Sequence, residues 1–214
     1  MKLQVALDVT SLDEARAVLK DVVDYVDIVE IGLLFYSHGY EALETLKREF
    51  PSVEYLADVK ISDGGYFCVK QAHDRGADYV TVLGVIDDET ILGAVQAARD
   101  TGIGLVIDMV GCRDFYERVK QLDEMGVDYI NIHTPADLQA KNVSPFEQLA
   151  VARMLVRNAK LSVAGGISPD NIDQVLPYKP EIVISGSALV RGPDRSGAAR
   201  RIREAIDATR EVHA

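Results

Sequence analysis

Residues 53–84 read VEYLADVKISDGGYFCVKQAHDRGADYVTVLG, and the prediction of the fold starts from this segment. It contains two short apolar runs, 53–60 and 78–84, without strict alternation of apolar and polar residues, as strands covered on both faces require. Between them, residues 66–76 have helical periodicity and end on Gly76, a residue type typical of helix C-caps. The stretch therefore predicts a strand–helix–strand unit with parallel strands.

The same unit recurs along the chain. Apolar, β-branched runs occupy residues 3–9, 26–32, 53–60, 78–84, 104–111, 128–134, 160–167 and 182–188. They begin roughly 22 to 32 residues apart, which is the spacing of βα units around a closed barrel. Ser11 and Glu14 form a capping-box signature at the first expected helix, and no linker interrupts the rhythm. We therefore expect an α/β protein with a single (β/α)8 TIM barrel domain over residues 1–214.

An open doubly wound sheet is the alternative arrangement of such units. That fold favours a Gly-x-Gly-x-x-Gly turn after an early strand, and this sequence has none. The absence of this turn, together with the spacing of the strands, favours the barrel.

Composition restricts the partners. The 214 residues include 34 acidic and 23 basic side chains, and the net charge of −11 disfavours nucleic acids and anionic membranes. The start, MKLQVALDV, reads as a strand and not as a signal peptide, and no apolar run reaches about 18 residues. We expect a cytoplasmic protein with a small-molecule partner. Cys68 and Cys112 are far apart, which argues against a disulfide or zinc framework.

Polar side chains stand at the carboxyl ends of the predicted strands, where α/β barrels carry their catalytic groups. They are Asp8, Glu30, Asp58, Lys60, Asp108 and His133. A single charge at a strand end is as consistent with a structural ion pair as with catalysis. Several uncompensated charges converging on one rim would cost several kcal/mol each, so the set as a whole predicts a functional site.

The third expected strand ends in the pattern Asp-x-Lys-x-x-Asp-Gly-Gly. Asp58 and Lys60 are two residues apart on a strand, so their side chains are expected on the same side, which can be the barrel mouth. Asp63 follows in a loop that Gly64-Gly65 makes flexible.

Glycines follow the last two expected strands. Gly165-Gly166 and Gly186-Ser187 allow backbone N–H groups to approach an anion, and this end of a TIM barrel is the usual phosphate position. Gly165-Gly166 is also compatible with a simple turn into a helix. His133 is the candidate general base, because imidazole groups titrate near neutral pH.

Several segments together bring a family resemblance. They are LQVALD, VDIVEIG, LADVKISDGG, GADYVTVLGV, VIDM, IHTPADLQA, SVAGGIS and SGSAL. Over essentially its whole length the chain resembles the orotidine-monophosphate decarboxylase suprafamily, in the branch that contains 3-hexulose-6-phosphate synthase and 3-keto-gulonate-6-phosphate decarboxylase. The resemblance implies Mg²⁺ bound by Glu30 and Asp58, with Asp8 and Lys60 lining the same pocket. It also implies a homodimer in which Asp63 reaches the neighbouring subunit's active site.

Two positions favour the synthase within this branch. The decarboxylase carries Glu where this chain has Asp108 and Arg where it has Ala136. The resemblance then implies an aldehyde-lyase that joins formaldehyde to ribulose 5-phosphate through an enediolate. In that reaction we expect Lys60 to stabilise the enediolate and Asp108 to orient substrate hydroxyls or Lys60.

The chain departs from the family after Gly32. It reads Leu33-Leu34-Phe35 where the family usually has Thr and Pro, which replaces a hydroxyl near the metal-binding strand with apolar bulk. Two alternatives therefore stay open: a sugar-phosphate decarboxylase, and a non-catalytic barrel that binds a sugar phosphate.

Overall fold

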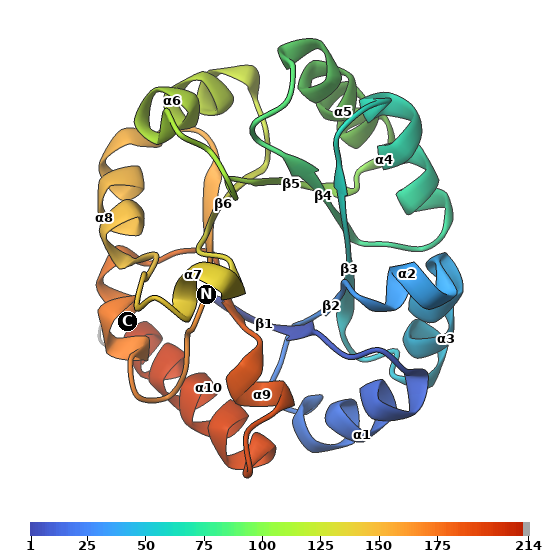
Figure 1. The fold of residues 1–214 in the computed structure, drawn as a ribbon, viewed down its shortest axis with the longest axis vertical. Coiled ribbons are helices and arrows are strands. Elements are labelled where there is room, and N and C mark those ends of the chain that lie inside the picture. Colours follow the sequence, from blue (N-terminus) through green and yellow to red (C-terminus); the bar gives the residue numbers. More distant parts are fainter. Residues whose placement is uncertain (212–214) are drawn as a thin grey trace.

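The computed structural model describes residues 1–211, which form a closed barrel of eight parallel strands surrounded by helices (Figure 1). The strands are β1 (Lys2–Leu7), β2 (Ile28–Ile31), β3 (Glu54–Ile61), β4 (Tyr79–Leu83), β5 (Gly104–Asp108), β6 (Tyr129–His133), β7 (Lys160–Ala164) and β8 (Ile182–Ser185). Each strand pairs with the next one in the chain, and β8 pairs with β1. The predicted (β/α)8 TIM barrel is confirmed. Residues 212–214 of the predicted domain lie outside the described residues.

Helices cover the outside of the barrel. They are α1 (Leu12–Val22), α3 (Tyr40–Glu49), α4 (Gly65–Asp74), α5 (Asp88–Thr101), α6 (Phe115–Met125), α8 (Phe146–Leu155) and α10 (Arg195–Glu211). Two 3-10 turns, η1 (Ile172–Gln174) and η2 (Leu176–Tyr178), connect β7 to β8. Three short helices, α2 (Leu34–His38), α7 (Ala136–Gln139) and α9 (Ser187–Val190), follow β2, β6 and β8. Within residues 1–211, no helix has the length and apolarity that crossing a membrane requires.

Helix α1 illustrates how the local sequence fixes an element. The Ser11 hydroxyl accepts a hydrogen bond from the Glu14 backbone N–H at 3.3 Å, and the Glu14 carboxylate accepts one from the Thr10 backbone N–H at 3.3 Å. These bonds satisfy N–H groups that a helix start leaves free. Its buried side chains recur at helical spacing: Ala15, Val18, Leu19 and Val22. The helix therefore starts where the capping box predicts and packs one apolar face on the barrel.

Side chains that point into the barrel form layers. An apolar cluster that includes Ile28, Leu56, Tyr79, Tyr129 and Ile182 fills the interior, and the rings of Tyr79 and Tyr129 meet edge to face at 5.8 Å. Buried polar side chains also point inward: Gln4, Thr81, Asn131 and Ser162. The charged groups at the carboxyl ends of the strands lie above these layers, so the site rests on a packed interior.

Acidic side chains fasten the opposite end of the barrel in a repeated way. An acidic residue stands just before each of β2, β4, β6 and β8. Its carboxylate accepts a hydrogen bond from a backbone N–H near the start of the neighbouring strand β1, β3, β5 or β7. The four pairs are Asp27–Leu3, Asp78–Tyr55, Asp128–Leu105 and Glu181–Leu161. The four bonds are 2.7 to 2.9 Å long. They fix neighbouring strands relative to one another far from the site.

Candidate active site

A cavity of about 380 Å³ opens at the carboxyl ends of the strands. Ten of the eleven residues predicted for the site line it: Asp8, Glu30, Asp58, Lys60, Asp108, His133, Gly165, Gly166, Gly186 and Ser187. Strand ends far apart in the sequence thus supply one concave surface, which is the kind of place where small ligands bind. The exception is Asp63.

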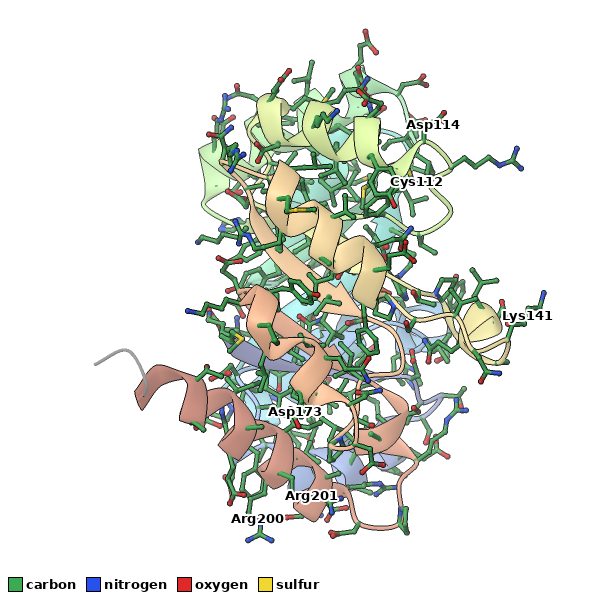
Figure 2. All side chains as sticks on the ribbon, turned by 90° about the vertical axis from the view of Figure 1, so that its left-hand side faces the viewer. Cys112, Asp114, Lys141, Asp173, Arg200 and Arg201 are labelled. Carbon is green, nitrogen blue, oxygen red and sulfur yellow. The ribbon has the colours of Figure 1, made fainter. Side chains whose placement is uncertain are left out.

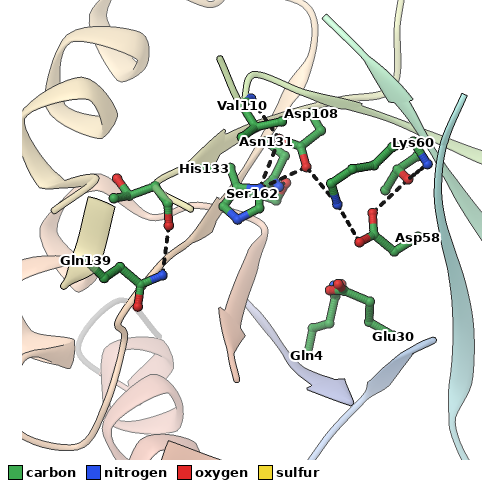
Figure 3. Close-up of polar contacts among 12 residues, drawn as sticks. Gln4, Glu30, Asp58, Lys60, Asp108, Val110, Asn131, His133, Gln139 and Ser162 are labelled. Atoms are coloured by element: carbon green, nitrogen blue, oxygen red, sulfur yellow. Dashed lines mark hydrogen bonds and ion pairs between the residues drawn. The ribbon is translucent and has the colours of Figure 1, made fainter. Parts of the chain in front are cut away.

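Lys60 links two carboxylates across the cavity. Its Nζ contacts Asp58 and lies 3.4 Å from Oδ2 of Asp108 (Figure 3). Burial alone would lower the pKa of Lys60, but the neighbouring Asp58 and Asp108 carboxylates outweigh burial and raise the pKa above its ordinary value. The ammonium group is therefore positively charged at neutral pH, in a place where a developing anion can use it.

His133 and Asp108 form a hydrogen-bonded pair. His133 Nδ1 lies 2.9 Å from Oδ2 of Asp108, and the Val110 backbone N–H donates to Oδ1 of Asp108 at 2.9 Å (Figure 3). Asp108 is only 1% exposed. Burial would raise the pKa of Asp108, but the hydrogen bond and charge of His133, with Lys60 nearby, lower it. A carboxylate that accepts from Nδ1 leaves Nε2 of the imidazole as the nitrogen for a substrate proton.

Three carboxylates line one cavity with Lys60, namely those of Asp8, Glu30 and Asp58. The position that a Cβ atom would take on Gly32 lies 3.7 Å from both Oδ1 of Asp8 and Oδ2 of Asp58. Burial, followed by the charge of Asp58, raises the pKa of Asp8 and raises that of Glu30 well above its usual value. Negative charge is therefore in excess here.

A buried amide beside Glu30 adds a further oxygen. Gln4 is fully buried, and its Nε2 donates to Oε2 of Glu30 at 2.5 Å, whereas its Oε1 has no hydrogen-bond partner among the described residues. An unsatisfied buried oxygen next to repelling carboxylates is a polar site that a hydrated cation would complete.

These donors fit a magnesium ion. Mg²⁺ prefers oxygen ligands, keeps several of its waters and is commonly held by one or two protein carboxylates. Among residues 1–211, no cluster of three or more His, Cys, Asp or Glu side chains forms a ready metal cage. Glu30 and Asp58 therefore match an open two-carboxylate site better than a closed structural one.

The glycine turn after β7 has a shape that only glycine fits. Gly165 has φ of +118°, and a Cβ atom there would lie 2.4 Å from the backbone oxygen of Thr134. The adjoining Gly166 packs against Gln139, whose Nε2 donates to the same Thr134 oxygen at 2.8 Å. Gln139 belongs to α7, in a segment that projects from this end of the barrel, with Lys141 pointing outward (Figure 2). The turn is thus held close to the cavity.

Asp63 lies away from the cavity in this chain. It is exposed, and its Oδ1 accepts a hydrogen bond from the Gly64 backbone N–H at 2.7 Å. A single chain therefore does not bring Asp63 together with the other predicted residues.

Among the lining residues that the sequence analysis did not single out are Gln4, Thr81 and Arg191. Gln4 and Thr81 had a recognisable signal, since each is a polar residue inside an otherwise apolar run. Arg191 directly follows α9, and its charge lowers the pKa of Asp8 against the effects of burial and Asp58. Nothing in the local pattern separates Arg191 from surface arginines.

Comparison with known proteins relates the chain to one enzyme family. The profile of the orotidine 5′-phosphate decarboxylase / HUMPS family matches residues 1–202. The chain is 40% identical to the 3-hexulose-6-phosphate synthase of Bacillus subtilis over 207 residues, covering 96% of this chain and 99% of the relative.

Solved structures agree. A crystal structure of 3-hexulose-6-phosphate synthase from Salmonella typhimurium superposes with a TM-score of 0.94 at 41% identity, covering 97% of this chain and 99% of the other. The 3-keto-L-gulonate-6-phosphate decarboxylase of Vibrio cholerae superposes with a TM-score of 0.85 at 28% identity, covering 97% of each chain. With its barrel, its strand-end charges and these similarities, the chain belongs to the orotidine 5′-phosphate decarboxylase / HUMPS family.

Proposed function

We propose that this enzyme reversibly condenses formaldehyde with ribulose 5-phosphate to a 3-hexulose 6-phosphate, as a metal-dependent aldehyde-lyase that forms an enediolate. The observation that carries the proposal is the placement of the Lys60 ammonium group between Asp58 and the Asp108–His133 pair in one cavity. This arrangement places a base and a positive charge side by side, as proton removal and stabilisation of the resulting enediolate would require. Relatives named 3-hexulose-6-phosphate synthase at about 40% identity support the choice of reaction.

Each side chain then has one task. His133, held by Asp108, removes the proton from the carbon next to the ketose carbonyl, and Lys60 stabilises the enediolate that results. The enediolate carbon attacks the carbon of formaldehyde, a carbon–carbon bond forms, and the aldehyde oxygen takes up a proton. Glu30 and Asp58 would hold Mg²⁺, which supplies positive charge that lowers the free energy of the substrate's oxygen anions.

The phosphate of the substrate would bind at the side of the cavity opposite Glu30 and Asp58. Gly165-Gly166 and Gly186-Ser187 offer backbone N–H groups, and Arg191 adds a positive charge. Binding energy gathered at the phosphate fixes the reacting end of the sugar relative to Lys60 and His133.

We further propose a homodimer with shared active sites. Asp63 is exposed two residues before α4, and the first turn of that helix includes Tyr66 and Phe67, whose exposed fractions are 44% and 68%. Exposed aromatic side chains of this size are typical of protein interfaces. An interface here would cover them and carry Asp63 toward the partner's cavity.

Ribulose 5-phosphate in D₂O gives the direct test of the proposed function. We expect the protein to exchange the proton next to the carbonyl in the presence of Mg²⁺, and to consume formaldehyde when it is added. EDTA should reduce exchange by about a hundredfold or more, because the charge that stabilises the enediolate is lost. NMR follows both reactions. Absence of exchange with Mg²⁺ present would refute the proposal.

A decarboxylase is the second candidate, favoured by the similarity to the Vibrio cholerae enzyme. Against it, Ala136 lines the cavity where the resemblance implies an arginine in decarboxylases. Faster release of CO₂ from 3-keto-gulonate 6-phosphate than consumption of formaldehyde would decide for the decarboxylase.

Arg191→Ala is expected to raise KM for ribulose 5-phosphate by about tenfold to a hundredfold with little change in kcat, because a charge-assisted bond to phosphate contributes about 1.5–3 kcal/mol. Steady-state kinetics measure both constants. Arg201→Ala, on the exposed surface of α10, is the matched control (Figure 2). An unchanged KM in Arg191→Ala would place the phosphate elsewhere.

A further inference from the structure

Thr81, in the middle of β4, makes two hydrogen bonds to the residues that carry the charge of the site. Its Oγ1 accepts from the Lys60 backbone N–H at 2.9 Å and donates to Oδ1 of Asp58 at 2.9 Å. The side chain is 3% exposed and lines the cavity floor. One buried hydroxyl therefore bridges Asp58 and Lys60.

The backbone at Lys60 explains why such a bridge is needed. Between Ala57 and Ile61, four steps along β3 match only two steps along β4, from Val80 to Val82. Lys60 has φ of +45°, in the left-handed region that residues other than glycine rarely adopt. Such a conformation persists only where surrounding contacts hold it. The sequence predicts that regular strand alternation puts Asp58 and Lys60 on the same side. Their side chains do meet, but an irregular stretch of β3 brings them together, and regular alternation does not.

The hydrogen bonds of Thr81 replace a backbone hydrogen bond that the irregular part of β3 does not make. The Lys60 N–H bonds to a side chain in place of the regular β3–β4 ladder, so the bulge carries no unsatisfied donor there. The same hydroxyl orients Asp58 through Oδ1 and leaves Oδ2 in contact with Lys60 Nζ. Rotation of Asp58 and relaxation of Lys60 are both opposed by one group.

We propose that Thr81 is a positioning residue that holds the Asp58 carboxylate and the Lys60 ammonium group in their working geometry. The inference rests on the proposed function and adds a residue that acts through two others without touching the substrate. It predicts a specific pattern: Thr81 controls kcat and metal binding, whereas KM for the sugar phosphate depends on the distant phosphate turns.

Three variants test the role. Thr81→Val keeps the shape and removes both hydrogen bonds, and Thr81→Ser keeps the hydroxyl. Thr101→Val is the matched control, because the Thr101 hydroxyl also makes two bonds, to Ala97 O at 2.7 Å and from Ile103 N at 3.4 Å, before β5 at the opposite end of the barrel.

Thr81→Val is expected to lower kcat for proton exchange by about tenfold to a hundredfold, since small misplacements of catalytic groups have effects of this size. KM for ribulose 5-phosphate should stay within about threefold, because uniform substrate binding is retained. The affinity for Mn²⁺, measured in the protein alone by water-proton relaxation, should fall about tenfold, because one carboxylate ligand is no longer held. Thr81→Ser and Thr101→Val should match the wild type in all three.

Other outcomes overturn the proposal. A Thr81→Val variant that keeps wild-type kcat and Mn²⁺ affinity, or a Thr81→Ser variant as impaired as Thr81→Val, would leave the hydroxyl a merely structural group. Failure of the proposed function is recognised separately, because the wild type itself would then not exchange ribulose 5-phosphate. The Mn²⁺ titration would in that case still decide the role of Thr81, and a wild type that binds no Mn²⁺ would refute it.

Discussion

Replacing Lys60 with alanine is expected to lower kcat for proton exchange by about a hundredfold to a thousandfold while the barrel stays folded, as the loss of a group that stabilises transition-state charge typically does. Lys60 is the cation that the structure places between Asp58 and Asp108. Without it, an enediolate would form beside the Asp58 and Asp108 carboxylates without the ammonium group that contacts both.

The measurement is single-turnover exchange in D₂O, with circular dichroism to confirm the fold. Lys160→Ala is the matched control, since Lys160 is an exposed lysine at the start of β7, with Nζ 5.2 Å from the centre of the Tyr129 ring. Asp58→Ala should show a comparable loss of turnover. Wild-type turnover in either Asp58→Ala or Lys60→Ala would show that the site is assigned wrongly.

The second large effect is expected at the imidazole–carboxylate pair. His133→Gln should lower the exchange rate by about a hundredfold to ten-thousandfold, the usual contribution of a positioned general base. Asp108→Asn should lower the rate by up to about ten-thousandfold, because the amide no longer stabilises a charged imidazole or fixes the tautomer that leaves Nε2 free. Both changes act on the step that removes the carbon-bound proton.

His73→Gln provides the control for the first variant, because His73 lies on α4 with a side chain 43% exposed and pairs with Asp74. The double variant Asp108→Asn/His133→Gln should be no slower than His133→Gln alone, since the two residues act as a unit. Additive losses would assign Asp108 a separate task, such as orienting substrate hydroxyls or Lys60.

Much of the architecture can be predicted from local sequence patterns. Each strand run, such as residues 78–84, is continuously apolar because both faces of the strand are covered, and each helix carries its own periodicity and cap. Gly102 and Gly126 end α5 and α6 in the left-handed conformation that is typical of glycine C-caps. The short helices α2, α7 and α9 were not predicted, because four or five residues carry too little periodicity.

The rim charges were also predictable as a group. Side chains such as Glu30, Lys60 and His133 lie at the ends of separate predicted strands, and closure of a parallel barrel brings all strand ends to one side. The bound Mg²⁺ and the contribution of Asp63 to a neighbouring subunit's site were implied by the resemblance to known enzymes, and both stay predictions.

The barrel, and the end of it at which charged side chains collect, follow from local sequence patterns, because burial and periodicity are properties of short segments. Which of those charged side chains touch depends on the tertiary structure. The contact of His133 with Asp108 and the bridge from Thr81 to Lys60 depend on the registers of neighbouring strands and on a left-handed backbone at one residue. Those features arise from closing and packing the whole barrel, and a segment of sequence does not encode them in isolation.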